Sequence, residues 1–328
     1  MKRSFGTDPR RSLPRPLYTT DLGSAYIGDS LELIKFLPDR SVNLILTSPP
    51  FALTRKKEYG NCSADEYVGW FLRFAKDFHR ILTEDGSFVL DLGGAYLSGN
   101  PIRTLYQYEL LIRLCKDIGF YLAQEFFHYN PARLPSPAEW VNVRRVRVKD
   151  SVNVVWWLSK SKNPKADNRK VLRLYGESMK LLLRNGYKPK VRPSGHDISG
   201  NFSKNNNGAI PPNLLELANT ESNSSYLRLC KENGVTPHPA RFPAAFPEFF
   251  IKFTTDPGDL VLDPFAGSNT TGRVAEYKER RWLAFELNRE YLLGSRFRFE
   301  DSLDLFCRIR VNGETTQKGA SRKSLLRC

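Results

Sequence analysis

Apolar runs of strand length recur along this 328-residue chain and alternate with longer segments of helical spacing. Such runs lie at residues 25–28, 42–46, 87–90, 121–129, 152–158, 260–262 and 282–285. A strand that is apolar on both faces needs a layer packed on each side of its sheet. Segments of helical spacing fall between the runs, at residues 31–37, 66–82, 105–118, 246–254 and 269–277. The alternation predicts an α/β fold with a Rossmann-like, mostly parallel, doubly wound sheet.

The stretch 161–235 interrupts this rhythm. It is basic at first and then rich in Asn, Ser and Gly, and it contains no clear strand. We interpret it as an inserted recognition region, although an irregular loop excursion without a binding role would give the same composition. The expected organisation is a basic arm (1–17), two halves of one domain (18–160 and 236–308) around the insertion, and a polar tail (309–328).

The chain carries 50 Lys and Arg against 35 Asp and Glu, a net charge of +15. An excess of this size favours a polyanionic partner, because each neutralised phosphate releases counterions. A solvated basic surface without such a partner is the alternative.

Several protein classes are disfavoured by the sequence. No run approaches the roughly 18 apolar residues that span a bilayer, and the basic, Pro-rich N-terminus has no apolar signal segment. Five scattered Cys without a CxxC pair indicate neither a disulfide framework nor a zinc site. We therefore expect a cytoplasmic protein with reduced thiols, no bound metal and no membrane partner.

A Gly-containing turn follows the late apolar run 260–262 and leads into a helix. Gly267 lets the backbone approach a ligand closely, and the exposed N–H groups of a helix start can hold a carboxylate, such as the amino-acid end of S-adenosylmethionine. Glu286 ends the next strand roughly 20 residues after Asp263, where an acid binds ribose hydroxyls. The candidate cofactor-binding residues of the turn are Asp263, Pro264, Phe265, Gly267, Ser268, Asn269, Thr270 and Thr271.

Two other interpretations of this turn remain open. NAD would bind a similar strand–turn–helix unit, but the GxGxxG spacing that approaches a pyrophosphate is absent. Asp263 at the strand end also suits a cationic ligand better than a pyrophosphate. A purely structural turn is the second alternative.

The sequence Thr47-Ser48-Pro49-Pro50-Phe51 directly follows the buried run 42–46. A loop at the carboxyl edge of an open α/β sheet is the usual ligand site of such folds. Consecutive prolines fix the backbone and cannot donate N–H groups, so their carbonyls and the Ser48 hydroxyl form a rigid acceptor cluster. Such a cluster can hold the hydrogens of a conjugated amino group and favour a tetrahedral, nucleophilic nitrogen, while Phe51 stacks on an extruded base.

The alternative for this loop is a proline-stiffened surface turn. Methylation of a ring carbon would require a thiolate nucleophile, and no Cys lies in either motif. The catalytic candidates are therefore Ser48, Pro49, Pro50 and Phe51, acting on an exocyclic amino group.

Together the two motifs resemble the amino-methylating DNA methyltransferases of the β group, a circularly permuted order with the catalytic motif before the recognition region and the cofactor motif last. Ser-Pro-Pro-Phe, in place of Asp-Pro-Pro-Tyr or Asn-Pro-Pro-Tyr, is typical of the cytosine-N4-specific branch. Over nearly its whole length the chain is similar to the PvuII-type modification methyltransferases. The matching segments are residues 26–33, 47–53, 55–61, 134–137, 155–157, 192–198, 210–215, 238–243 and 267–272.

The resemblance implies roles for individual residues. Asp29 takes the family position that faces the cofactor adenine, although it could equally cap the helix that begins near Leu31. Glu286 corresponds to the ribose-binding acid, and the segment with His238 closes over the cofactor, unless that histidine is a satisfied loop residue. The remaining cofactor-binding positions implied by the match are Ser30, Thr47, Phe242 and Leu287.

Basic and amide side chains supply candidate DNA contacts. Arg55, Lys56 and Lys57 follow the catalytic loop and suit phosphate contact, or form a solvated charged face. Lys204 and Asn205 lie in the insertion and could reach base edges, since Asn can pair with adenine in a bidentate manner. The resemblance makes a cytosine of CAGCTG the plausible target.

The leading hypothesis is a site-specific methyltransferase that uses S-adenosylmethionine to modify cytosine N4 in double-stranded DNA, as the protective half of a restriction–modification system. A cognate endonuclease is then implied genetically, not as a bound partner, and the chain could be a monomer or a homodimer. An adenine-N6 methyltransferase, an RNA methyltransferase, an inactive DNA-binding relative and an NAD-linked oxidoreductase are the alternatives.

Overall fold

The computed structural model describes residues 13–52, 62–186, 190–191, 197–198, 204–219, 224–300, 310–311 and 314–315. Its centre is a mixed sheet with the strand order β13-β12-β1-β2-β11-β10-β3-β4-β6-β5-β9. Five neighbouring strands in the middle, β2, β11, β10, β3 and β4, run parallel, whereas β6 runs antiparallel between β4 and β5. The mostly parallel, doubly wound sheet predicted from the apolar runs is confirmed.

The central strands are β2 (Gly23–Ile27), β3 (Val42–Thr47), β4 (Leu82–Leu92), β10 (Leu260–Asp263) and β11 (Arg281–Glu286). The antiparallel side is formed by β5 (Tyr121–Tyr129), β6 (Val152–Ser159) and the short β9 (Leu214–Glu216). The opposite edge carries β1 (Tyr18–Thr19), β12 (Arg310–Val311) and β13 (Glu314–Thr315), and a separate pair joins β7 (Lys190–Val191) to β8 (Asp197–Ile198). The polar tail thus extends the edge of the sheet in its described part.

The helices are α1 (Ser30–Leu33), α2 (Ala64–Ile81), α3 (Tyr106–Arg113), α4 (Glu177–Asn185), α5 (Ser225–Glu232), α6 (Ala245–Thr254), α7 (Thr270–Tyr277), α8 (Arg289–Ser295) and α9 (Phe297–Glu300). Short helical turns η2 (Ile34–Phe36), η3 (Leu114–Ile118), η4 (Glu139–Val143) and η5 (Asn168–Val171) complete the set in the described residues. None of these helices is both long and apolar enough to cross a membrane.

Two hydrophobic cores lie on the two faces of the sheet. Along β3, Ile45 points into the core under α1, α2 and α3, whereas Leu44 and Leu46 point into the core under α6 and α7. Successive side chains of a strand alternate between faces, so a run of apolar residues fills both cores. This burial explains the almost continuous apolar runs in the sequence.

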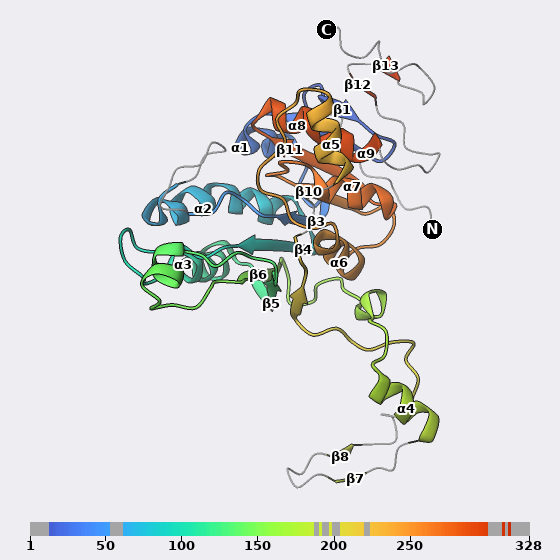
Figure 1. Cartoon of the computed structure of the whole chain (residues 1–328). Coiled ribbons are helices and arrows are strands. Elements are labelled where there is room, and N and C mark those ends of the chain that lie inside the picture. The colour runs from blue at the N-terminus through green and yellow to red at the C-terminus, as the bar shows by residue number, and fades with distance from the viewer. Residues whose placement is uncertain are drawn as a thin grey trace, which may run out of the picture.

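The region 161–235 differs from the expectation that it lacks strands. Its strand β9 pairs with the end of β5, and η5 packs against α6, where the Asp167 N–H donates to the Phe253 carbonyl oxygen over 2.8 Å. The part with α4, β7 and β8 lies away from the sheet (Figure 1). The insertion therefore begins and ends on the main body.

The expected N-terminal arm also ends earlier than residue 17. Leu13 and Leu17 are buried, in the two cores, and the Leu17 N–H donates to the Ala25 carbonyl oxygen over 2.8 Å. These two leucines anchor the chain, because the burial of a leucine side chain contributes about 1.5–3 kcal/mol.

Candidate active site

A cavity of about 640 Å³ opens at the carboxyl edge of the central strands. Its wall comes from the ends of β3, β4, β10 and β11, the adjoining ends of β5 and β6, and the segment that precedes α6. Fifteen of the site residues expected from the sequence line it: Asp29, Ser30, Ser48, Pro49, Pro50, Phe51, His238, Phe242, Pro264, Phe265, Gly267, Ser268, Thr270, Glu286 and Leu287. The two motifs, far apart in the sequence, thus share one cavity.

The turn after β10 depends on glycine. Gly267 has φ +51°, and a Cβ added there would lie 3.0 Å from the His238 ring. Its N–H donates to Glu286 Oε2 over 2.8 Å, while Glu286 Oε1 accepts the Asn288 N–H over 2.8 Å. Burial raises the pKa of Glu286. A side chain at position 267 would force apart the turn, the acid at the end of β11 and the histidine above them.

Asp263 does not line the cavity but lies beneath it. Its carboxylate accepts the Thr47 and Thr271 hydroxyls over 2.8 and 2.7 Å and the Phe265 N–H over 3.2 Å. Burial raises its pKa to about 6 although these bonds oppose the shift. These bonds give Asp263, Thr47 and Thr271 a supporting role, because they tie β3 to the turn, and their role as cofactor ligands stays a prediction.

Asn269 is likewise fully buried. It starts α7 with φ +53°, accepts the Gly272 N–H over 3.0 Å and donates to the Tyr18 hydroxyl over 2.9 Å. Arg298 holds the same turn from behind by donating to the carbonyl oxygen and hydroxyl of Ser268, over 2.8 and 3.0 Å. The shape of the turn is therefore fixed by hydrogen bonds that no ligand has to supply.

Asp29 caps a helix and also reaches the cavity, and its predicted place facing the cofactor adenine stays a prediction. Its carboxylate accepts the Leu31 N–H over 2.9 Å as the N-cap of α1, and the side chain also lines the cavity. Ser30 lines the cavity too, and its hydroxyl donates to the Pro264 carbonyl oxygen, which joins α1 to the turn after β10.

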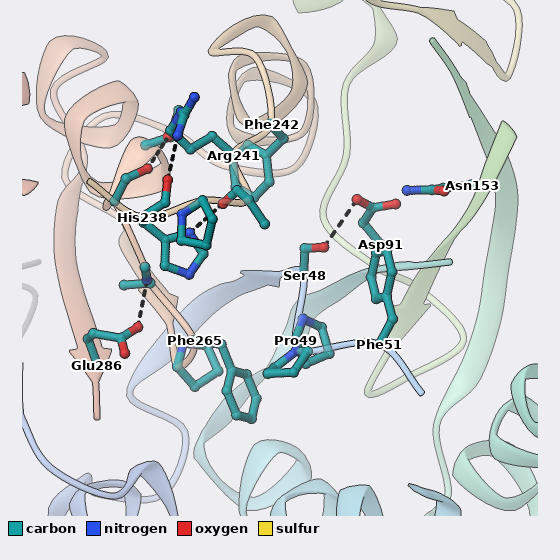
Figure 2. Close-up of a pocket in the computed structure, with 18 of the residues that line it drawn as sticks. Ser48, Pro49, Phe51, Asp91, Asn153, His238, Arg241, Phe242, Phe265 and Glu286 are labelled. Carbon is teal, nitrogen blue, oxygen red and sulfur yellow. Dashed lines mark hydrogen bonds between the residues drawn. The ribbon is translucent and has the colours of Figure 1, made fainter. Parts of the chain in front are cut away.

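The segment with His238 covers the turn from the other side (Figure 2). The His238 N–H donates to the Tyr226 hydroxyl over 2.9 Å, and its ring meets that of Tyr291 edge-on at 4.7 Å. Burial lowers the pKa of His238 to about 4, so the imidazole is neutral near pH 7. A neutral imidazole avoids repulsion from Arg241 and Arg298, whose positive charges also lower this pKa.

Aromatic side chains from α2 form a floor that the sequence analysis missed. Trp70 and Phe74 lie 5.7 and 5.1 Å from the Phe265 ring, between ring centroids, and all three line the cavity. Helical spacing indicated that α2 has an apolar face, but only the packing of α2 against the turn brings two of its aromatics to the cavity.

The catalytic loop follows β3 and faces the neighbouring strand β4. The Ser48 hydroxyl donates to Asp91 Oδ2 over 3.2 Å, and Asp91 is almost completely buried (Figure 2). Burial is the main cause that raises the pKa of Asp91. Phe51 packs on Gly93, where an added Cβ would lie 2.5 Å from its ring. Ser48 has one hydroxyl hydrogen, so its bond to Asp91 leaves the oxygen as an acceptor toward the cavity.

Asp91 belongs to a polar group that the sequence analysis also missed. Asp91 pairs with Val155 across β4 and β6, and His128 pairs with Asn153 across β5 and β6. Residues 153 and 155 of β6 share a face, so Asp91, His128 and Asn153 gather on the side of α6. An acid directly after the apolar run 87–90 was the available signal.

Among the described residues, none of the predicted DNA contacts lines the cavity. Arg55, Lys56 and Lys57 lie outside the described part of the chain. Lys204 and Asn205 are exposed in the insertion, where Asn205 Oδ1 accepts the Asn207 N–H over 2.9 Å. Their role in DNA binding stays a prediction.

Most residues of the cavity lie in a segment that matches a known protein family. The profile of a DNA methylase family matches residues 42–295, from β3 through α8, and so includes every wall of the cavity except the segment around Asp29. The chain belongs to this family of DNA methylases. The methylase is 55% identical over 311 residues to the type II methyltransferase M.PvuII of Proteus hauseri, covering 92% of each chain.

Solved structures agree with this assignment. One titled PvuII DNA methyltransferase (cytosine-N4-specific) superposes on the methylase with a TM-score of 0.72 at 50% identity, covering 89% of this chain and 91% of that one. The putative DNA modification methylase TTHA0409 of Thermus thermophilus, in complex with S-adenosyl-L-methionine, shares the fold with a TM-score of 0.52 at 18% identity, over 85% of this chain and 96% of that one. The expected permuted methyltransferase fold is confirmed.

Proposed function

We propose that this methylase transfers a methyl group from S-adenosylmethionine to the N4 amino group of a cytosine extruded from double-stranded DNA. The observation that carries the proposal is the Ser48–Asp91 hydrogen bond beside the Gly267–Glu286 turn in one cavity. An acceptor for amino hydrogens and a cradle for a nucleoside cofactor then face each other, as amino methylation requires.

The turn side of the cavity fits the cofactor. Glu286 accepts hydrogen bonds from two backbone N–H groups and keeps further lone pairs for ribose hydroxyls. Asp29 adds a second acid at the rim of the cavity. The Phe265 ring, supported by Trp70 and Phe74, offers an apolar face to a purine. When bound, S-adenosylmethionine supplies an electrophilic methyl group on a sulfonium.

Ser48 and the two prolines prepare the amino nitrogen. The lone pair of a cytosine amino group is delocalised into the ring, which makes the nitrogen a poor nucleophile. The Ser48 oxygen and the carbonyl of the proline segment accept its two hydrogens and draw it toward a tetrahedral form, whose lone pair can attack. Phe51, held against Gly93, provides the ring on which the extruded base stacks.

Asp91 completes the proton balance. As the new N–C bond forms, the methylated nitrogen carries a positive charge and must lose one hydrogen. Ser48 accepts that proton while giving its own to Asp91 Oδ2, so the product leaves neutral and the proton rests on a carboxyl whose pKa is already raised by burial. The carboxyl returns the proton to solvent after the products leave.

The sequence target and biological setting complete the proposal. The similarity to a PvuII-type enzyme supports CAGCTG as the recognition sequence and the protective half of a restriction–modification system, with a cognate endonuclease encoded alongside. We assign recognition to the insertion between residues 161 and 235, with Lys204 and Asn205 as base contacts and Arg55, Lys56 and Lys57 as phosphate contacts.

The test uses the purified full chain, a duplex that contains CAGCTG, a duplex of scrambled sequence and radiolabelled S-adenosylmethionine. We expect label in the first duplex only, and digestion to nucleosides should give N4-methylcytosine by mass. Ser48→Ala, which keeps the loop but removes the acceptor, should lose most of this activity. N6-methyladenine as the product would overturn the assignment of the target base, and no transfer to any duplex would overturn the enzymatic function.

A further inference from the structure

The polar group on the base side of the cavity has a defined order of donors and acceptors. Ser48 comes first and gives its hydrogen to Asp91, and Asn153 lies beside Asp91 (Figure 2). Arg133 comes last and donates to Asn153 Oδ1 over 3.1 Å. All four side chains line the cavity, so the wall changes from acceptors near Ser48 to donors near Arg133.

Arg133 fixes the orientation of the Asn153 amide. A guanidinium has only donors, so its partner on Asn153 must be the amide oxygen, and the amide NH₂ must point the other way. Figure 2 shows the amide nitrogen of Asn153 on the side of Asp91. The NH₂ carries two hydrogens, and a contact with the neighbouring Asp91 carboxylate occupies only one of them. At least one amide hydrogen therefore remains for a ligand.

Only part of the hydrogen-bonding capacity of the Arg133 guanidinium is used by the described residues. It is half-buried, and burial lowers its pKa, which marks a cation kept in a poorly solvated place. No ion pair ties it to a carboxylate among the described residues, and its hydrogen-bond partner there is the neutral amide of Asn153. A guanidinium has five N–H donors, so several of them are available to an acceptor in the cavity.

Cytosine and adenine differ where this wall is rich in donors. Each base presents an amino group and, next to it, a ring nitrogen that accepts. Cytosine then carries a carbonyl oxygen on the following carbon, whereas adenine has only a C–H there. With the amino group at Ser48, the cytosine edge therefore reads donor, acceptor, acceptor, which is complementary to a wall that ends in donors.

We propose that Arg133 and Asn153 form a donor pair that binds the ring carbonyl oxygen of the extruded cytosine and so selects cytosine over adenine. The inference rests on the proposed function, because it places the amino group at Ser48. A site built to bond a carbonyl rejects a base that lacks it, since the buried donors are then left unpaired. Ser48 prepares the amine of either base, and the donor pair decides which base fits.

The test measures equilibrium binding of three duplexes to the full chain with S-adenosylhomocysteine present. The duplexes differ only at the target position, which holds cytosine, adenine or an abasic residue, each opposite an abasic site so that extrusion costs are matched. Wild type should bind the cytosine duplex most tightly. In Arg133→Met the cytosine duplex should lose roughly 10- to 100-fold in affinity, whereas the adenine and abasic duplexes change less than about threefold.

Two further variants complete the design. Asn153→Ser, which removes the amide, should show the same selective loss. Arg144→Met is the matched control, because Arg144 is exposed on the same connection between β5 and β6 and does not line the cavity. Whatever Arg144→Met does to DNA affinity, it should change all three duplexes by one common factor.

The outcomes separate the alternatives. An equal loss for all three duplexes in Arg133→Met would mean a phosphate contact or a structural role and would overturn the proposal. So would an undiminished preference for cytosine over adenine. If wild type transferred no methyl group to cytosine in the activity assay, the proposed function itself would fail. The binding assay needs no methyl transfer, so its result for the donor pair would still stand or fall separately.

Discussion

The two sides of the cavity differ in how their buried polar groups are satisfied. On the turn side, Asp263 accepts three hydrogen bonds and Glu286 accepts two, all from groups within the chain. On the base side, three buried atoms lack a well-formed hydrogen bond to the described residues. They are the two ring nitrogens of His128 and Asp91 Oδ1. Asp263 on the turn side and Asp91 on the base side are both almost completely buried.

The contrast indicates what each side is built for. A polar network that is satisfied internally is rigid, so the turn keeps its shape before any cofactor arrives. Buried polar atoms without partners lower stability, by about 1–3 kcal/mol each, and they are retained where a ligand completes them. The base side therefore gives up stability for groups that fit the substrate. Four substitutions test this contrast.

The largest effect is expected for Asp91→Asn. The amide cannot take up the proton that leaves the amino group, so methyl transfer should slow by about 10²- to 10³-fold. Cofactor affinity should stay the same, since the turn is untouched. Single-turnover rates and a cofactor titration measure the two quantities. A variant with a wild-type rate would show that Asp91 takes no part in the reaction.

Glu286→Gln should act on the other side only. The change removes a charged acceptor at the turn, which should weaken cofactor binding by roughly 10- to 100-fold, as for a lost hydrogen bond to a charged group. The rate at saturating cofactor should fall much less. Calorimetry gives the affinity, and steady-state kinetics gives the split between KM and kcat. A loss confined to kcat would contradict the assignment.

Asp263 should leave a signature in the pH dependence of stability. Its folded pKa of about 6 lies above the unfolded value of 3.8, so the native state holds the proton longer as pH rises. The free energy of unfolding should therefore fall by about 2 kcal/mol between pH 4 and 6, relative to Asp263→Asn. His238, with its lowered pKa, contributes the opposite slope in both proteins and cancels in the difference. Denaturant unfolding at a series of pH values gives the free energy of unfolding of both proteins. The same pH dependence in wild type and Asp263→Asn would contradict this expectation.

The smallest effect is expected for His128→Phe. His128 stacks on Phe246 at 5.1 Å between ring centroids, and a phenyl ring keeps that contact while removing two buried nitrogens. Stability should stay constant or rise by about 1 kcal/mol, whereas methyl transfer should drop about tenfold. Chemical denaturation and turnover assays report the two changes. A clear loss of stability would mean that His128 serves the fold and not the substrate.

The sequence predicted correctly those features whose physical cause lies within a few neighbouring residues. The apolar runs defined the central strands because a strand buried on both faces needs apolar side chains throughout. The prolines after β3 and the glycine after β10 marked the carboxyl edge because their backbone constraints act within a few residues. For the same reason Glu286 was correctly expected beside the turn.

Strand order and register govern which polar side chains point into the cavity. Ser48, Asp91, His128 and Asn153 come from strands whose spatial order, β3-β4-β6-β5, differs from their order in the chain. A shift of one residue in any pairing would turn these side chains to the other face. Likewise, Asp263 and Thr47 had the right chemistry for ligands but bond to each other beneath the cavity.

Residue patterns alone thus specify the α/β fold, the position of both loops and the acceptor chemistry of Ser-Pro-Pro-Phe, since these depend on local backbone and hydrophobic patterns. The folded chain alone reveals that the cofactor side is satisfied internally and that Arg133 and Asn153 line the same cavity as Ser48. Strand pairing and register are set by packing across the whole core, and no short segment records them.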